Sequence, residues 1–397
     1  MLTANHLRWG IPIAGSDRWI GGSIYLDNLG AAVRSLPTPE QPVISLLKED
    51  MRTTASPLLR TGSTEVQLHT YQLTGTLRRL PFAHKFADLS AITRVRRQVH
   101  DQFDIVFPCT SLFQIKAHQR AVAWIPDFQH IHLPQYFSPL ERRGRDRGYQ
   151  RLAKQASLVV LSSQDARKDF DSLYPAQAHK VRVLSFATVP TEGWFTGDPQ
   201  RVARSYGLPD VFAMIPNQFW MHKNHLCVFE ALHRLRQHGK TIALVCTGFT
   251  GDYRNNRYFN EIRAYLQAHD LEPYVHILGL IPRADQIQLL RRAAIVIQPS
   301  LFEGWSTVVE DVRVLGKRVI VSNIAVHREQ NVEHAVYFDP RSPAMLADLL
   351  MSQLPTLCPG PDLEREAVSR AEQQDRIVTF AKAFLQIGGE VAALDSP

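Results

Sequence analysis

The residues most able to do chemistry in this 397-residue chain lie in and just after the loop PSLFEGWST. Glu303 stands at the mouth of this loop, and Asp311 falls in the first turn of the helix expected to follow. Thr307 and Glu310 have the spacing of a capping box, which predicts that this helix starts at Thr307. The N–H groups at a helix start attract phosphate, and Gly304 lets the backbone approach a ligand closely. The loop therefore predicts a phosphate-binding site, with a plain acidic helix start as the alternative.

A cation follows another apolar run. Lys223 lies in the segment NQFWMHKNH, directly after residues 212–216. A cation in such a place stabilises the negative charge of a departing phosphate. The plainer interpretation is a solvated lysine ahead of a helix. Lys223 nevertheless occupies the same kind of loop as Glu303, after a strand, which favours a shared site.

Strands and helices must alternate around these loops. Apolar residues recur at helical spacing from Leu226 to Leu235, and Asp285 with Gln288 fits the capping box of a further helix. Alternation of this kind implies a parallel sheet with helices on both faces, where ligands bind beyond the carboxyl ends of the strands. The strands expected in the second half are 212–216, 242–246, 275–278, 295–298 and 319–322.

The first half alternates less regularly. Residues 188–204 are rich in turn formers and predict a linker, whereas 353–364 predict a loop and 375–394 a helix. The strands expected here are 7–13, 42–47, 104–107, 121–125, 158–161 and 181–184.

The acidic pattern resembles a known signature. In retaining GT-B glycosyltransferases, chiefly glycosyltransferase family 4 (group 1), two acidic residues are separated by seven others, as Glu303 and Asp311 are here. The resemblance implies that Glu303 contacts the hydroxyls of a donor sugar and that Asp311 binds the ribose. Glu310, one residue early, is the alternative, but its expected capping role favours Asp311. The resemblance also implies that intervening backbone amides hold sugar and phosphate, from Gly304, Trp305, Ser306 and Thr307.

The same resemblance extends to the loops around this signature. Members of the family carry an arginine and a lysine that bind the donor diphosphate; Lys223 fits the lysine, whereas Gln218 stands at the arginine's place. The missing cation would then come from His222, His225 or Arg254. The loop 280–283, beginning at Leu280, is implied to touch the nucleobase through its backbone.

Three positions in the first half complete the resemblance. Gly21 and Gly22 match the glycine pair that approaches the donor phosphate after the first strand. Asp127 follows Pro126, which takes the place of a histidine near donor sugar and acceptor, so that His130 or His132 would substitute. An aspartate with two histidines also suggests a metal site, but the family generally needs no metal, so the sugar-binding interpretation is favoured.

The resemblance implies an α/β fold of the GT-B type, in which two Rossmann-like domains face a central cleft and a C-terminal helix crosses back to the N-terminal domain. The expected domains are an acceptor-binding domain at 1–188, a linker at 189–204, a nucleotide-sugar-binding domain at 205–374 and the crossing helix at 375–397.

Composition limits the partners. Hydrophobic residues make up 45% of the chain, and no apolar run approaches the roughly 20 residues of a membrane helix. We expect no signal peptide, hence a cytoplasmic protein, and the four scattered cysteines predict buried hydrophobic positions rather than a disulfide framework or zinc site. The net charge of +7 suits anionic partners, and basic clusters at 92–97 and 141–154 are either solvated helix faces or a surface for anionic membranes.

The expected activity is metal- and cofactor-independent transfer of a hexose, of the mannose or rhamnose type, from a GDP- or UDP-sugar. The acceptor is expected to be a glycan or lipid-linked molecule, the stereochemistry retained, and the pathway polysaccharide or lipopolysaccharide assembly at the cytoplasmic membrane. The alternatives are a nucleotide-sugar epimerase and a catalytically inactive module of an assembly complex. A nucleic-acid-binding protein is suggested by charge alone, and no recognition motif supports it.

Overall fold

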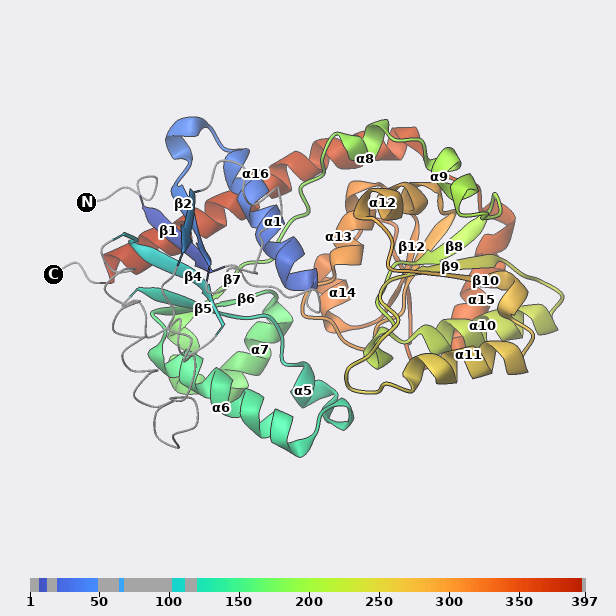
Figure 1. Cartoon of the computed structure of the whole chain (residues 1–397), viewed down its shortest axis with the longest axis horizontal. Helices are drawn as coiled ribbons and strands as arrows, with labels where there is room; N and C mark the ends of the chain where they lie inside the picture. The colour runs from blue at the N-terminus through green and yellow to red at the C-terminus, as the bar shows by residue number, and fades with distance from the viewer. Residues whose placement is uncertain (1–6, 13–19, 49–63, 68–101, 111–119, 395–397) are drawn as a thin grey trace, which may run out of the picture. The chain divides into compact units, whose positions relative to one another are not determined.

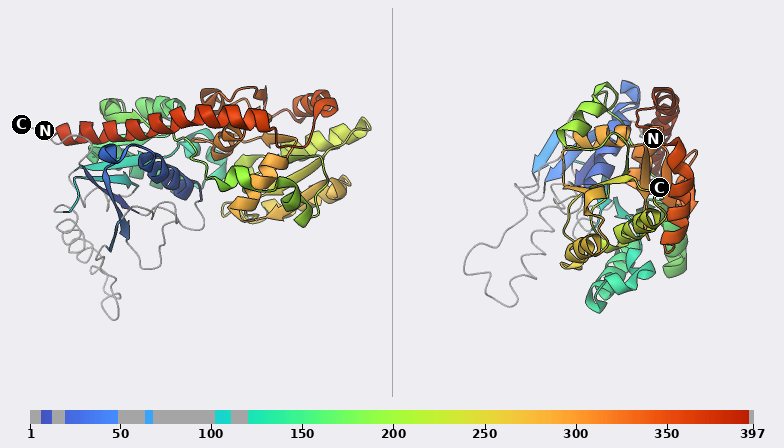
Figure 2. Two further views of the ribbon diagram at one scale, coloured as in Figure 1. Left: turned by 90° about the horizontal axis from the view of Figure 1, so that it is seen from above. Right: turned by 90° about the vertical axis from the view of Figure 1, so that its right-hand side faces the viewer.

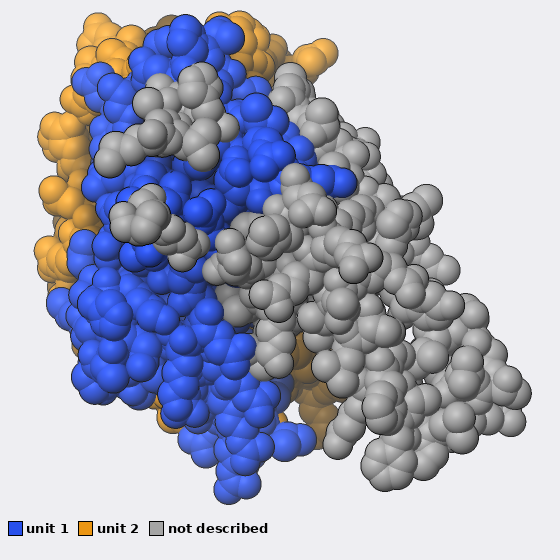
Figure 3. Space-filling view, turned by 90° about the vertical axis from the view of Figure 1, so that its left-hand side faces the viewer, with its two compact units in different colours: residues 1–128, 139–189, 375–397 blue, residues 129–138, 190–374 orange. Residues whose placement is uncertain are grey.

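Two compact units make up the chain (Figure 1), and Figure 3 colours them separately. Unit 1 comprises residues 1–128, 139–189 and 375–397, and unit 2 comprises 129–138 and 190–374. The computed structural model describes residues 7–12, 20–48, 64–67, 102–110 and 120–394.

Unit 1 is built on a seven-stranded parallel sheet of order β3-β2-β1-β4-β5-β6-β7. The strands are β1 (Arg8–Pro12), β2 (Val43–Lys48), β3 (Thr64–Gln67), β4 (Ile105–Cys109), β5 (Ala121–Ile125), β6 (Leu158–Leu161) and β7 (Val181–Val183). The helices are α1 (Ile20–Arg34), α6 (Pro139–Gln155), α7 (Gln164–Leu173) and part of α16 (Leu363–Ala393), with 3-10 turns at Thr38–Glu40 and Pro175–Lys180.

Unit 2 is built on a six-stranded parallel sheet of order β10-β9-β8-β11-β12-β13. The strands are β8 (Phe212–Ile215), β9 (Ala243–Thr247), β10 (Val275–Gly279), β11 (Ile295–Gln298), β12 (Val319–Ser322) and β13 (Val336–Phe338). The helices are α5 (Gln129–His132), α8 (Gly193–Thr196), α9 (Pro199–Ser205), α10 (His225–Gln237), α11 (Tyr258–Ala268), α12 (Arg283–Arg292), α13 (Thr307–Val314), α14 (Ala325–Gln330) and α15 (Pro343–Gln353), with 3-10 turns at Pro134–Tyr136, Met221–Lys223, Glu272–Tyr274 and Leu354–Thr356.

Helices cover both faces of the sheet in unit 2, which is why its strands are short continuous apolar runs. In β8, Ala213 and Ile215 pack in a core with residues of α10, α11 and α15. Phe212 and Met214, which alternate with them, pack in a second core with residues of α9, α12 and α13. Because successive side chains of a strand point to opposite faces, one apolar run supplies both cores.

One continuous helix, α16, contributes to both units (Figure 2). Near its start, Glu366 pairs with the buried Arg291 of unit 2 at 2.7 Å. Further along, the ring of Phe384 packs on Trp9 of unit 1, with ring centroids 4.1 Å apart. A Cβ atom on Gly388 would lie 2.4 Å from the Trp9 ring, so the helix requires glycine at this close approach.

The expected alternation is confirmed, with differences at element ends. The sequence does not predict the edge strands β3 and β13. Helix α16 begins at Leu363 and not at 375; its first turns escaped prediction because they are polar and carry no apolar stripe. Helix α12 begins at Arg283, so Asp285 and Gln288 do not form its capping box; the Asp285 carboxylate instead accepts from the Tyr206 hydroxyl. Three cysteines are buried as expected, whereas Cys358 is exposed.

Among the residues described, no helix is long and apolar enough to cross a membrane. The basic cluster 141–154 forms most of α6, while the cluster 92–97 lies outside the described residues.

Candidate functional site

Two of the predicted loops meet where the strand order of unit 2 reverses. Strand β8 is followed outward by β9 and β10 on one side of the sheet, and by β11, β12 and β13 on the other. Ligands of open α/β sheets bind at the carboxyl ends of the strands beside such a reversal. Lys223 follows β8 and Glu303 follows β11, so the topology brings both predicted residues to this edge.

The loops after β8 and β11 are bonded to each other. Lys223 ends a 3-10 turn, and Asn224 adopts a left-handed conformation with φ of 60° before α10 begins. The Asn224 amide donates to the carbonyl of Pro299 at 3.0 Å, and the Leu301 N–H donates to the carbonyl of His222 at 2.8 Å. These bonds fix the position of Lys223 relative to the segment that carries Glu303.

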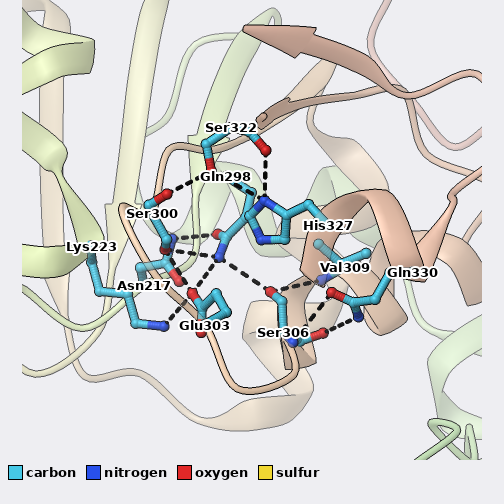
Figure 4. Close-up of polar contacts among 10 residues, drawn as sticks. All are labelled: Asn217, Lys223, Gln298, Ser300, Glu303, Ser306, Val309, Ser322, His327 and Gln330. Atoms are coloured by element: carbon cyan, nitrogen blue, oxygen red, sulfur yellow. Dashed lines mark hydrogen bonds and ion pairs between the residues drawn. The ribbon is translucent and has the colours of Figure 1, made fainter. Parts of the chain in front are cut away.

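The Glu303 carboxylate is held by one of its oxygens (Figure 4). Its Oε1 accepts from Lys223 Nζ at 2.6 Å, from Ser300 Oγ at 2.6 Å and from Gln298 Nε2 at 2.9 Å. In the part of the chain that the structure describes, every donor to this carboxylate reaches Oε1. The second oxygen, Oε2, is therefore left to accept from a ligand hydroxyl.

Helix α13 begins where the sequence predicts, but with another cap. Ser306 is the N-cap, and its Oγ accepts from the N–H of Val309 at 3.4 Å. Thr307 is the first helical residue, so the capping box predicted for Thr307 and Glu310 is wrong by one residue. Ser306 caps the helix because its hydroxyl, one residue before Thr307, reaches the free N–H of the first turn.

Gln330 of α14 completes the support of this helix start. Its Nε2 donates to the Ser306 carbonyl at 2.9 Å, and its Oε1 accepts from the Ser306 N–H at 3.3 Å. The Ser306 N–H, which the resemblance assigns to the donor, is thus already bonded within the chain. Gly304, Trp305 and Thr307 are partly exposed.

Glu310 and Asp311 face different neighbours. Glu310 is fully buried, accepts from Gln330 Nε2 at 3.0 Å and lies 3.5 Å from Arg313. Asp311 accepts from Arg283 at 2.6 Å, and Arg283 is 40% exposed at the start of α12. Arg283 follows the loop after β10, where Leu280 is 65% exposed. Glu310 is therefore not a capping residue, and Asp311 is the one of the two that contacts Arg283, the residue that follows the loop after β10.

Two of the three residues considered as the missing cation are neutral. Burial lowers the pKa of His225 to about 3, and the same cause lowers the pKa of His222 well below its usual value. The third, Arg254, has a side chain that is 5% exposed and donates to Gln129 Oε1 at 2.8 Å. Gln218 itself is partly exposed.

Segment 129–138 packs within unit 2 and carries two of the candidate histidines. The ring of His132 stacks on Phe302, the neighbour of Glu303, with centroids 5.1 Å apart. His130 is 2% exposed and its ring meets the edge of Phe137. Of the two, His132 is therefore the one whose packing partner adjoins Glu303.

The remaining predicted residues lie in unit 1. Gly21 and Gly22 fall in the first turn of α1, and a Cβ atom on Gly21 would meet nothing within 4 Å. Tyr149 is half-buried, and burial, with the charge of the Asp127 carboxylate second, raises the pKa of its phenol. Within the described residues, no group of three or more histidine, cysteine, aspartate or glutamate side chains is arranged to hold a metal ion.

Sequence reasoning missed the polar residues that support Glu303. Gln298 and Ser322 end two buried strands, and His327 lies on α14 behind them. The Ser322 hydroxyl donates to the Ser300 carbonyl at 2.6 Å. His327 Nδ1 lies 2.9 Å from the Ser322 carbonyl, and because a carbonyl only accepts, Nδ1 is the nitrogen that carries the proton. A signal was available, because a glutamine that ends the apolar run IVIQ must find buried partners.

Comparison with known proteins adds the family context. Residues 204–355 match the family model for glycosyl transferases group 1, which is less than half of the chain. No curated protein matches the chain.

Solved structures share the architecture over nearly the full length. HepE from Anabaena, in complex with UDP and glucose, is 18% identical with a TM-score of 0.71, covering 96% of this chain and 99% of that one. Sucrose-phosphate synthase from Thermosynechococcus elongatus is 14% identical with a TM-score of 0.66, at 98% and 99% coverage. WaaG, a glycosyltransferase involved in lipopolysaccharide biosynthesis, is 12% identical with a TM-score of 0.59, at 98% and 99% coverage. The fold is therefore the GT-B fold that the sequence predicts.

Proposed function

We propose that this protein is a glycosyltransferase that moves a hexose from a nucleotide diphosphate sugar to a glycan or lipid-linked acceptor. The observation that carries the proposal is the geometry of the Glu303 carboxylate. Three donors, one of them Lys223, hold its Oε1, and Oε2 is left to accept from a ligand. The match of residues 204–355 to glycosyl transferases group 1 supports it, since that range contains both residues.

The chemistry follows from this arrangement. Glu303 Oε2 accepts from a hydroxyl of the donor sugar, and Lys223, with the start of α13, stabilises the diphosphate as it leaves. The bond from the sugar's anomeric carbon to the phosphate oxygen breaks, and the acceptor oxygen bonds to that carbon on the same face. The acceptor's proton passes to the departing phosphate oxygen. Retention, membership of family 4 and independence of metals rest on the sequence resemblance.

Lys223 has two partners in this proposal. It pairs with Glu303 at 2.6 Å, and both side chains are largely buried, at 17% and 9% exposure. An incoming diphosphate offers the ammonium a second anion. In this proposal the diphosphate of the donor weakens the ion pair between Lys223 and Glu303, while a hydroxyl of the sugar donates to Glu303 Oε2.

The donor is a GDP- or UDP-sugar, and mannose- or rhamnose-type hexoses are the first candidates. HepE, which binds UDP and glucose, adds UDP-glucose to those worth testing. We propose residues 1–188 as acceptor-binding, 189–204 as linker and 205–374 as donor-binding. Cell-surface polysaccharide or lipopolysaccharide assembly is the proposed pathway, and the likeness to WaaG supports testing it.

A membrane-facing role is proposed for α6. Its sequence PLERRGRDRGYQRLAKQ carries six cations against two acids, and Leu140 at its start is 80% exposed. Charge reversal of Arg143, Arg147 and Arg151 is expected to abolish binding to vesicles containing anionic lipid. Unchanged binding in a vesicle co-sedimentation assay would leave α6 as a solvated helix.

The test of the function combines binding with transfer. Without added metal, one nucleoside diphosphate among GDP, UDP, ADP and TDP, with CMP also screened, is expected to raise the melting temperature by mass action. The corresponding sugar is then expected to be transferred, and Glu303→Gln to abolish transfer, while the exposed control Glu272→Gln keeps it.

Each other outcome has a meaning. Full turnover by Glu303→Gln contradicts the proposed mechanism. Release of an altered nucleotide sugar without acceptor indicates an epimerase, and no shift with any nucleotide indicates an inactive module or a nucleic-acid-binding protein.

A further inference from the structure

A buried carboxamide lies between Glu303 and the start of α13. Gln298, the last residue of β11, is 0% exposed. Its Nε2 lies 2.9 Å from Glu303 Oε1 and 3.2 Å from Ser306 Oγ, and its Oε1 accepts from Asn217 Nδ2 at 2.6 Å (Figure 4). The amide therefore connects the carboxylate with the N-cap of α13.

The neighbours allow one orientation of this amide. An ionised carboxylate only accepts hydrogen bonds, so the NH₂ end of Gln298 must face Glu303. Asn217, 4% exposed at the end of β8, supplies the donor that the oxygen end then requires. With the amide reversed, Gln298 Oε1 would face the Glu303 carboxylate and two acceptors would repel each other. Asn217 thus sets which end of Gln298 points at the site.

A second arm holds the same oxygen from the other side. Ser300 donates to Glu303 Oε1 at 2.6 Å, and its carbonyl accepts from Ser322 Oγ at 2.6 Å. Burial lowers the pKa of His327 behind Ser322 to about 4, so that ring is neutral at neutral pH. The two arms meet, because Gln298 Nε2 also lies 3.1 Å from Ser300 Oγ, but only Gln298 is bonded to Asn217.

We propose that Gln298, oriented by Asn217, is a positioning residue that fixes Glu303 Oε1 and thereby aims Oε2 at the donor sugar. This inference rests on the proposed function of the site. Because the same amide bonds to the N-cap Ser306, it sets the carboxylate that recognises the sugar at a constant distance from the helix start that faces the phosphates. Gln298 itself contacts neither the sugar nor the phosphates in this proposal. Its loss misplaces Glu303, so it weakens sugar recognition and leaves nucleotide recognition intact.

Asn217→Asp isolates the orientation. A carboxylate at 217 accepts only, so it draws the NH₂ end of Gln298 and turns Oε1 toward Glu303. We expect Asn217→Asp and Gln298→Glu to lower kcat/KM for transfer about 10- to 100-fold, the range for a hydrogen bond to a charged group. Both are expected to keep the wild-type Kd for the nucleoside diphosphate and to lose the added affinity of its sugar conjugate.

The experiment includes its own structural controls. Gln298→Met keeps the length of the side chain and removes every hydrogen bond of its amide. The double variant Asn217→Asp with Gln298→Met is expected to be no worse than Gln298→Met alone. Gln288→Met removes another buried amide of unit 2, bonded to the carbonyls of Gly193 and Trp194, and is expected to transfer normally. Thermal unfolding selects the variants that fold, and either single variant suffices for the comparison.

Three results overturn the inference, and each can be told apart from the others. Folded Asn217→Asp and Gln298→Met with wild-type kcat/KM and sugar affinity show that Glu303 needs no positioning by this amide. A wild-type protein that binds no nucleotide and transfers no sugar removes the proposed function and the inference with it. Equal loss of nucleoside diphosphate and nucleotide-sugar binding also contradicts it, because that result indicates general damage to the site.

Discussion

Two adjacent carboxylates in α13 compete for one role. Glu310 points to Gln330 and Arg313, whereas Asp311 meets Arg283 at 2.6 Å beside the loop after β10. We propose Asp311 as the acceptor for a ribose hydroxyl of the nucleotide, because it lies beside that loop. The Arg283 guanidinium, 40% exposed, holds this carboxylate in place.

Asp311→Asn therefore separates the two. An amide at 311 loses the charge that pairs with Arg283 and weakens the bond to a ribose hydroxyl, so we expect about a 10-fold weaker Kd for the nucleoside diphosphate. Glu310→Gln is expected to lower the melting temperature with a smaller effect on that Kd, since Glu310 is enclosed by protein. Isothermal titration with the diphosphate identified by thermal shift measures both. A larger loss in Glu310→Gln assigns the ribose to Glu310 instead.

At the scale of elements, the sequence predicts positions well and ends less well. Strands such as 295–298 were predicted in full because their continuous apolar runs stop at polar residues. The edge strand β13 was missed because its three residues, VYF, are too few to show a pattern. The start of α16 was missed because most residues before Ile377 face solvent, and the buried ones, such as Glu366 and Gln373, are polar and add no apolar stripe.

The site was predictable where chemistry is carried in one segment and hidden where it crosses segments. Glu303 and Lys223 stand out in their own loops, yet their mutual contact at 2.6 Å spans 80 positions of the chain. The role of Gln298 depends on Asn217, and that of Ser306 on Gln330, and no local spacing encodes either pair. The sequence predicts Thr307 as the cap instead of Ser306, because Thr307 and Glu310 have the spacing of a capping box.

The cap of α13 gives a test at this scale. Ser306→Ala removes the Oγ that accepts from Val309 N–H and from Gln298, so we expect a loss of about 1 kcal/mol from capping, with weaker diphosphate binding. Thr307→Ala, at the first helical position, is expected to cost little stability. Urea unfolding of both variants measures the difference. Equal destabilisation would show that Thr307 shares the capping role.

For the whole molecule, the pH dependence of stability depends more on which titratable side chains are buried than on the net charge of +7. Most cations of α6 are exposed, whereas unit 2 encloses three histidines near Lys223 and Glu303. Burial is the first cause of the lowered pKa values of His222, His225 and His327, with repulsion from Lys223 adding to each. The stability of unit 2 therefore depends on these rings staying neutral.

This burial predicts acid sensitivity. The unfolded chain protonates each histidine near pH 6.5, whereas folded His225 stays neutral down to about pH 3 and folded His327 to about pH 4. Between those values the unfolded state binds more protons, so stability falls as the pH falls from 6.5 toward 4, by up to about 1.4 kcal/mol per pH unit for each ring. His225→Phe keeps the stack on Phe219 and removes one ring from this balance. Its melting temperature relative to wild type is expected to rise steadily from pH 7 to pH 5. A difference that stays constant over this range would mean that the pKa of His225 is the same in the folded and the unfolded chain.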